Sequence, residues 1–160
     1  MAYAGNNHPR SLIRKVIYDS LVQFAKQIGI PANDIYVGRY YAVDKRKLPC
    51  IYVETLDSQD TQDVASQGFV SHIRSLDAKI FIATDEEESQ IDAIDACENL
   101  MRGCEIYTVS PNSNLNSQDS ISEVSISSDK IVPAPDGQAM AQGELTLTIK
   151  YLDQLFNYEV

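Results

Sequence analysis

The chain has no tryptophan, only two histidines and no run of 18 consecutive apolar residues. Without such a run, nothing in the sequence predicts a membrane-spanning helix. His8 and His72 lie far apart and show no HxxxH or HxxE spacing, which argues against a metal site built on them. The opening residues, MAYAGNNHPRS, lack the basic region and apolar core of a secretory signal.

Cysteine is also scarce. The three cysteines, Cys50, Cys97 and Cys104, are an odd number, have no CxxC spacing and sit in apolar surroundings. This usage predicts buried, reduced thiols and fits a cytoplasmic environment. Cys50 follows Pro49 at the start of a strand pattern, where a reactive thiolate is not expected.

Basic residues are few relative to acidic ones. Thirteen lysines and arginines stand against 23 acidic residues, giving a formal net charge of −10. Tight binding to nucleic-acid phosphates normally needs a basic face, so this class of function is disfavoured. The charge is compatible with a surface past which DNA slides without sticking, and it favours solubility before assembly.

Sequence signatures of catalysis are missing too. There is no GxSxG elbow, and Gly38 and Gly68 are isolated, so no glycine-rich phosphate loop exists. The acidic run 85–88 is expected to complement the positive end of a helix dipole, with Thr84 as the cap. We therefore expect a protein that is not an enzyme and carries no cofactor or metal.

What is present predicts a single domain over residues 1–160, with its core at about 9–152. The leader 1–8 and the tail 153–160 are expected to be extended. An amphipathic helix of about five turns should begin at Pro9 and stop at Gly29, and Pro31 prevents its resumption.

Strand patterns make up most of the rest. We expect strands at 34–40 and 49–55, a long polar loop at 56–68, a strand at 69–84, and a helix ending at Arg102-Gly103. Ile91, Ile94, Cys97, Leu100 and Met101 should form the apolar stripe of that helix. A polar segment at 110–120, a serine-rich irregular strand and an alternating strand at 141–151 follow. The order helix-strand-strand-strand-helix-strand-strand predicts an α+β fold, with two helices packed on one face of a mostly antiparallel sheet.

Two positions in the strand 69–84 do not fit a core. Leu76, Ala78, Ile80 and Ile82 alternate on one face, and continuing that face backwards reaches Arg74 and His72. The strand is therefore expected to outrun the core there, as an arm or a contact with a partner.

The only concentrated positive charge is Lys45-Arg46-Lys47. This cluster is either a solvated loop or one half of a subunit contact that pairs with acids such as those in 56–64. Arg39 beside Gly38 is either a turn residue or a donor fork for a neighbouring carboxylate. Tyr40 and Tyr41 belong to a residue type enriched at interfaces, although tyrosines that cover a sheet are equally ordinary.

An ordered set of segments resembles the tail terminator proteins of lambda-like long-tailed phages, the minor tail protein U family. The resemblance rests on Ile13-Arg14, Ile17, Asp19 and Leu21; on Gly38-Arg39, Asp44, Pro49 and the strand IYV; and on AKIFI at 78–82 and LTLTIKY at 145–151. It runs from about residue 13 to residue 152. Val37 and Tyr40 stand where the family pattern has an acid and a proline.

The resemblance implies a non-enzymatic virion protein that forms a hexameric ring on the finished tail tube, at its head-proximal end. Such a ring would stop polymerisation of the major tail tube protein and present the surface that a head-completion or connector protein joins. DNA would pass through the lumen without specific binding, and no membrane is involved. The resemblance makes a ring or tube contact the first reading of Arg39, Tyr40, Tyr41, Lys45, Arg46, Lys47, His72 and Arg74.

Two other classes remain open at this point. One is another connector or neck protein of the same virion. The other is a small-ligand-binding α+β module, or an enzyme whose chemistry has no recognisable motif.

Overall fold

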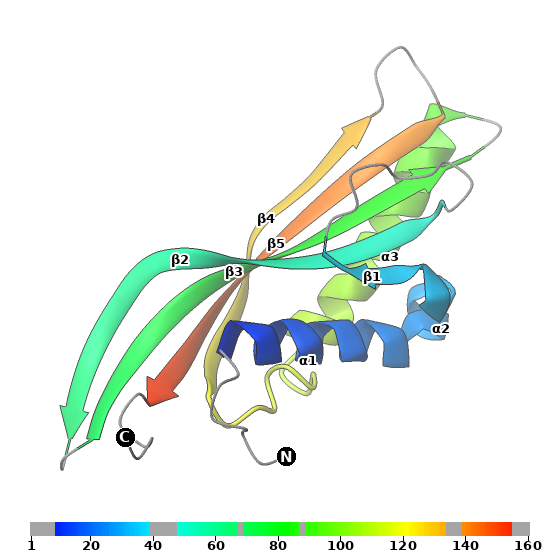
Figure 1. The fold of residues 1–160 in the computed structure, drawn as a ribbon. Coiled ribbons are helices and arrows are strands. Elements are labelled where there is room, and N and C mark those ends of the chain that lie inside the picture. Colours follow the sequence, from blue (N-terminus) through cyan, green and yellow to red (C-terminus); the bar gives the residue numbers. More distant parts are fainter. Residues whose placement is uncertain (1–8, 39–47, 67–68, 87–88, 134–138, 155–160) are drawn as a thin grey trace.

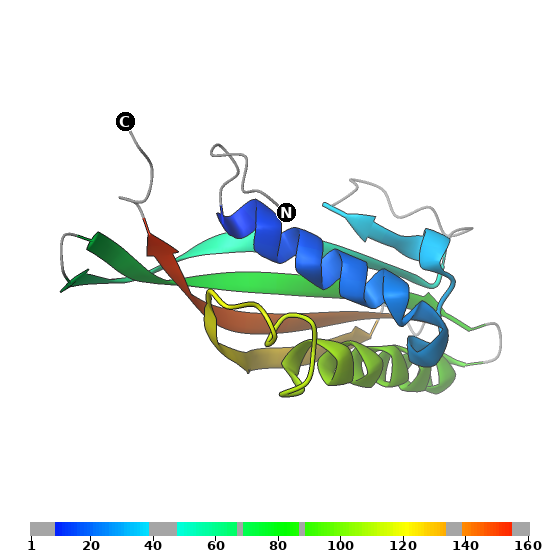
Figure 2. The same cartoon turned by 90° about the horizontal axis from the view of Figure 1, so that it is seen from below.

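The computed structural model describes residues 9–38, 48–66, 69–86, 89–133 and 139–154, although the side chains of 56–66, 69–72, 133 and 153–154 lie outside the description. It is an α+β fold with a five-stranded sheet in the order β1-β2-β3-β5-β4. The short β1 (Ile35–Val37) runs parallel to β2 (Cys50–Ser66), and the other neighbouring pairs are antiparallel. The long helices α1 (Pro9–Gln23) and α3 (Gln90–Val109) cover the same face of the sheet (Figure 2). The predicted fold class is confirmed.

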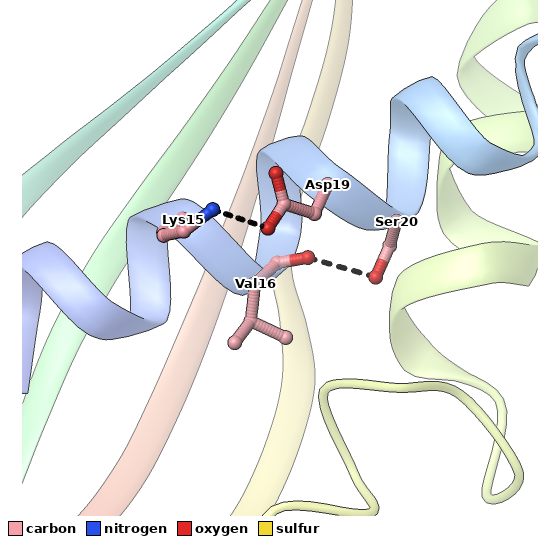
Figure 3. Close-up of polar contacts among 4 residues, drawn as sticks. All are labelled: Lys15, Val16, Asp19 and Ser20. Carbon is pink, nitrogen blue, oxygen red and sulfur yellow. Dashed lines mark hydrogen bonds and ion pairs between the residues drawn. The ribbon is translucent and has the colours of Figure 1, made fainter. Parts of the chain in front are cut away.

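The first helix begins at Pro9, as predicted, but it is interrupted near its end. Helix α1 spans Pro9–Gln23, and a short α2 follows at Ala25–Ile28. Gly29 ends it with φ at 104°, a left-handed conformation that glycine adopts readily. Ile13, Ile17 and Leu21 are buried against the sheet, whereas the Lys15–Asp19 ion pair lies on the exposed side (Figure 3).

Strand β2 is much longer than predicted. Its apolar start is buried on both faces, with Ile51 and Val53 facing the helices and Cys50 and Tyr52 on the opposite side. It then continues to Ser66, so the loop expected at 56–68 is wrong for residues 56–66. The polar residues join the sheet because β3 (Phe69–Asp85) pairs with β2 from Cys50↔Ala83 to Asp57↔Leu76 and again from Thr61↔Arg74 to Ser66↔Phe69. β2 is an interior strand, and β3 is the central one.

Helix α3 (Gln90–Val109) begins and ends later than predicted. Ser89 is its N-cap and accepts a hydrogen bond from the backbone N–H of Asp92 at 3.1 Å. Thr84 is still in β3, where its hydroxyl donates to the carbonyl of Ala93 at 2.6 Å and ties strand to helix. The predicted cap at Thr84 is therefore wrong, and so is an acidic first turn at 85–88, since Asp85 closes β3, Glu86 precedes Ser89, and 87–88 lie outside the described residues.

Gly103 lies inside α3 and does not end it. A Cβ at this position would stand 3.1 Å from the Cα of Ile28, so the missing side chain lets α2 approach α3 closely. The apolar stripe is confirmed for Cys97, Leu100 and Met101, and Ile94 is partly buried against the core. Ile91, by contrast, is 69% exposed.

The segment after α3 is polar but anchored. Leu115 is fully buried, and the Asn116 side chain donates to the carbonyls of Val109 and Ser110 at 3.0 and 2.9 Å. These bonds serve the C-terminal carbonyls of α3, which have no partners within the helix.

The last two strands match their patterns. Strand β4 (Ile121–Pro133) is a sheet edge with two register shifts, which confirms the predicted irregularity. In β5 (Met140–Gln154) the predicted alternation is confirmed by the burial of Ala141, Gly143, Leu145, Leu147, Ile149 and Tyr151, and of the residues between them Thr146 is also buried. Gly143 leaves room for α3, because a Cβ there would lie 2.8 Å from the sulfur of Cys97.

Candidate assembly interface

The β2–β3 hairpin extends past the helices as an arm (Figure 1). We define the arm as residues 61–66 of β2 and 69–74 of β3. The backbone pairing of the arm runs from Thr61↔Arg74 to Ser66↔Phe69, beyond a register shift between Asp57 and Thr61. On the other side of β3, strand β5 remains paired with it as far as Ser71↔Gln154.

Among the described residues, only a short stretch of the outer side of β2 has a neighbouring strand. In the described parts of the chain, β1 pairs with β2 at Ile51–Val53, and the N–H of Gly38 donates to the Val53 carbonyl at 2.9 Å. From Glu54 to Ser66 the described residues add no further strand on this side. An uncovered strand edge is a template for another chain, and native proteins protect it with charges and bulges or use it for binding.

His72 and Arg74 both lie in the arm. His72 is opposite Asp63 in the backbone register, and Arg74 lies between Thr61 and the buried Tyr151. Arg74 is half-buried, while the side chain of His72 lies outside the described part. The structure thus puts these two predicted residues together, where the sheet leaves the helices.

The remaining predicted contact residues, Arg39, Tyr40, Tyr41, Lys45, Arg46 and Lys47, lie outside the described residues. The ends of their segment are described. Gly38 lies beside Val53, and Leu48 packs on the small apolar cluster around Cys50 and Tyr52. Gly38 and Leu48 therefore both lie near the start of β2, away from the arm.

The sheet face opposite the helices carries a polar ladder that the sequence analysis missed. The Lys79 ammonium lies 2.9 Å from a Glu144 carboxylate oxygen, and the Thr148 hydroxyl donates to Asp77 at 3.2 Å. Lys150 and Glu123 pair at 3.3 Å further along. Strand alternation was the available signal, but which residues pair depends on the register between distant strands.

This face ends in an apolar cluster near the Gly38 and Leu48 ends. Tyr52 and Phe81 lie with ring centroids 5.5 Å apart, and Tyr36 and Leu48 pack against the same cluster. Cys50 and Ala83 complete it and are buried. The face is thus apolar at one end and charged but internally paired in the middle.

The three cysteine thiols are expected to have low reactivity. Burial raises the pKa of Cys50 and of Cys97 to about 11 and that of Cys104 to about 12. Such thiols stay protonated near neutral pH and are poor nucleophiles and metal ligands.

A second feature that the sequence did not reveal is an acidic pair between α3 and β4. Burial raises the pKa of the Glu105 carboxyl, and a hydrogen bond with Asp129 raises it further. The Arg102 guanidinium, 3.1 Å from a Glu105 carboxylate oxygen, opposes this shift. The two acids are 24 positions apart in sequence, so only the packing of α3 on the edge strand brings them together.

Other sites are limited in the described part of the chain. It contains no cluster of three or more histidine, cysteine or acidic residues suited to a metal ion. None of its helices is both long and apolar enough to cross a membrane. A shallow depression of about 290 Å³ lies between α2, the start of α3 and Pro49, with Thr84 and Asp85 on its wall.

Comparison with known proteins finds a shared fold and no sequence family. No protein-family model matches the chain, and no curated protein sequence does. Among solved structures, the chain is similar to a chain described as part of the virion of a native gene transfer agent particle. The two superpose with a TM-score of 0.58 at 10% sequence identity, over 92% of this chain and 100% of the other. At this identity the two proteins share a fold.

Proposed function

We propose that this chain is a structural protein of a tailed-phage-like virion and, more narrowly, a tail terminator. The observation that carries the proposal is the match of nearly the whole chain to the whole of a virion protein chain. A match of that extent means that the two chains share their whole fold, and not only a supersecondary motif. The resemblance of its segments to the minor tail protein U family gives the narrower role.

In this role, copies of the chain form a ring, hexameric as in the family, on the head-proximal end of the finished tail tube. The ring stops further addition of tube protein and offers a surface to the head. The role is non-enzymatic and needs binding surfaces in place of a reactive centre. An arm that projects beyond the helices and a helix-free sheet face supply such surfaces.

The net charge of −10 suits a ring through which DNA passes. Acidic surfaces repel phosphates and do not retain them. The lysines of the polar ladder, Lys79 and Lys150, are already paired with carboxylates. They are therefore weak candidates for phosphate contacts.

The decisive experiment is tail assembly in a phage or particle that lacks this protein. We expect tails longer than their normal length that fail to join heads, and restoration of normal length when the protein is supplied. Tails of normal length that lack only a later neck component would instead identify a connector or neck protein. Immunolabelling that finds the protein at the head-proximal end, at a copy number near six, supports the terminator.

A solution measurement complements this experiment. Size-exclusion chromatography with light scattering, at several protein concentrations and with divalent cations, tests whether rings form without the tube. A mass near six subunits or a ring in electron micrographs supports the proposal. A persistent monomer or dimer whose melting temperature rises with a small ligand favours a ligand-binding module.

A further inference from the structure

We infer that the acidic outer side of helix α3 in one copy docks on the basic outer side of helix α1 in the next copy, so that neighbouring subunits join head to tail. The inference rests on the proposed ring and names the helices that join its subunits. Its experiment is chosen so that failure of this contact and failure of the tail-terminator role give different results.

The two helices carry opposite net charge. Residues 9–28, which include α1 and α2, contain four basic side chains and one acid, although the whole chain has a net charge of −10. Helix α3 contains four acids and one arginine. Protein surfaces usually intersperse the two signs, and here they are separated on different helices. The basic side chains are Arg10, Arg14, Lys15 and Lys26, and the acids of α3 are Asp92, Asp95, Glu98 and Glu105.

The basic side chains of α1 lie on its flank away from α3. An N–H of the Arg14 guanidinium donates to the Thr55 hydroxyl at 3.4 Å, just beyond the stretch of β2 that pairs with β1. Arg10 lies one turn earlier on the same side, and the side chain of Lys15 is 61% exposed. On the opposite flank, Gln23 accepts a hydrogen bond at 3.0 Å from the segment that follows α3. The basic flank of α1 therefore points toward the outer side of β2.

The acidic side chains of α3 lie on its flank toward β4 and solvent. Glu105 contacts Asp129 of β4, whereas Gly103 packs on α2, and these two contacts fix how the helix is turned. Glu98 lies two turns before Glu105 and on the same side of the helix, with Asp95 beside it toward solvent. Both Asp95 and Glu98 are exposed.

The helix dipole does not account for these acids. Asp92 lies in the first turn of α3, where a carboxylate complements the positive end of the helix. This effect falls off within the first turn, and Asp95 and Glu98 lie beyond it. Beside them Ile91 is 69% exposed, the largest exposed fraction among the large apolar side chains that the structure describes. Such a flank suits a surface that is basic and partly apolar, and on α1 the half-buried Tyr18 lies among the basic side chains.

The two flanks of one copy lie on opposite sides of its helix layer. Helix α1 packs over β1 and β2, and α3 packs over β3, β5 and β4, so they cover opposite halves of the sheet (Figure 2). The described ion pairs agree with this separation, because Lys15 pairs with Asp19 and Arg102 with Glu105, each inside one helix. A contact between the two flanks therefore needs a second copy.

This geometry has a direct consequence for assembly. Copies placed side by side bring the α3 flank of one against the α1 flank of the next, and each copy keeps one free surface of each kind. Heterologous contacts of this type close into rings when the rotation per subunit allows it. Opposite charges across the contact guide association and help to set its register.

The test uses two variants with reversed charge. The first is Arg14→Glu with Lys15→Glu, and the second is Asp95→Lys with Glu98→Lys. Each variant alone places like charges across every contact. We expect the protein concentration at half-assembly, measured by light scattering, to rise at least about tenfold for each, and assembly of the wild type to weaken at high salt.

Mixing the two variants distinguishes a contact between copies from a defect within one chain. In an equimolar mixture, the reversed α1 of the first variant meets the reversed α3 of the second, and the native pair of surfaces forms at the next contact. We expect assembly to return to within about threefold of the wild type, in alternating rings. A mixture that assembles no better than the separate variants would overturn the contact, as would normal assembly of either variant alone.

A milder variant, Arg14→Gln with Lys15→Gln, guards against misfolding of the first, since Arg14 also contacts Thr55. Glutamine keeps a donor for the Thr55 hydroxyl and removes the charge. We expect the concentration at half-assembly to rise at least about threefold, and an unchanged value would overturn the contact. Circular dichroism and thermal melting check that every variant is folded.

Matched controls change exposed residues outside the helices by the same charge. They are Lys130→Glu with Lys150→Glu, and Asp119→Lys with Glu123→Lys. Both controls should assemble like the wild type. A loss as large as that of the helix variants would show a general effect of net charge and overturn the contact. If the wild type is monomeric in solution, the same series is scored by binding to tail tubes made without the protein.

The outcomes separate the two proposals. Copies that assemble and respond to the charge swap, but do not limit tail length, refute the terminator role and keep the contact. Tails that are capped equally well by each variant alone refute the contact and keep the role. A wild-type protein that neither self-associates nor binds tail tubes overturns both.

Discussion

Glu105 shows how a single residue acquires a property that its surroundings create. Its side chain is 8% exposed, and the free energy of transfer from water therefore disfavours the ionised carboxylate. The hydrogen bond with Asp129 requires a shared proton and acts in the same direction. The carboxyl thus tends to stay protonated at a pH where exposed glutamates are ionised.

This shift predicts a pH dependence of stability that Glu105→Gln removes. Because the pKa in the folded state is above that in the unfolded state, the stabilisation is fully present below the unfolded value and is lost as the pH rises through the folded value. The glutamine keeps a donor toward Asp129 and does not ionise. The free energy of unfolding of the wild type, measured in urea, should therefore fall relative to that of the variant over this pH range.

The acids that do not contact Glu105 are common to both proteins and cancel in the difference, so the comparison reports on Glu105 together with its partner Asp129. Two curves that run parallel from acidic to neutral pH would show that Glu105 ionises in the folded protein as easily as in the unfolded one. That result would contradict the proposed role of burial and of Asp129.

At the scale of the elements, the end of α3 is set by tertiary contacts. The helix continues through Gly103 to Val109 and is closed by the side chain of Asn116 from the following segment. The same segment inserts the fully buried Leu115 into the core. The end of α3 and the segment that follows it therefore stabilise each other.

Asn116→Ala tests this closure. The variant loses hydrogen bonds to the carbonyls of Val109 and Ser110, and we expect the free energy of unfolding to fall by about 1–2 kcal/mol. Thermal or urea unfolding measures the change. The control is Asn112→Ala, an exposed residue in the same segment, which should change stability by less than about 0.5 kcal/mol.

A loss no greater for Asn116→Ala than for Asn112→Ala would mean that water serves the carbonyls equally well. The helix would then be held by its apolar stripe alone. Cys97, Leu100, Met101 and the fully buried Cys104 supply that packing.

At the scale of the whole molecule, stability is unevenly distributed. Helices α1 and α3 cover one part of the sheet, and the arm extends beyond them (Figures 1 and 2). Backbone hydrogen bonds that lack apolar cover open more readily than those in a core. The two ends of β2 should therefore differ in local stability although they belong to one strand.

Amide hydrogen exchange should report this difference. In the free protein, the amides of Ile51 and Val53 should exchange orders of magnitude more slowly than those of residues 61–66. If the arm is a binding surface of the proposed ring, its amides should gain protection on assembly. Equal protection along β2 in the free protein would contradict the uneven stability, and no gain on assembly would argue against the arm as a binding surface.

The elements with local patterns could be predicted from the amino-acid sequence alone. The alternation of 141–151, the alternation at Leu76, Ala78, Ile80 and Ile82, and the helix stop at Gly29 each depend on which face a residue presents or on the backbone freedom of one residue. The structure confirms these elements. The resemblance of their order to a tail protein family was also available at this stage.

The arm was anticipated for β3 alone; its second strand at 56–66, the start and end of α3, and the acidic pair depend on tertiary contacts. Residues 56–66 have the composition of a loop and become a strand because β3 pairs with them. Gly103 looks like a helix stop and is instead the point where α2 packs closely on α3. In each case the deciding contact joins residues far apart in sequence, which local propensity and periodicity do not encode.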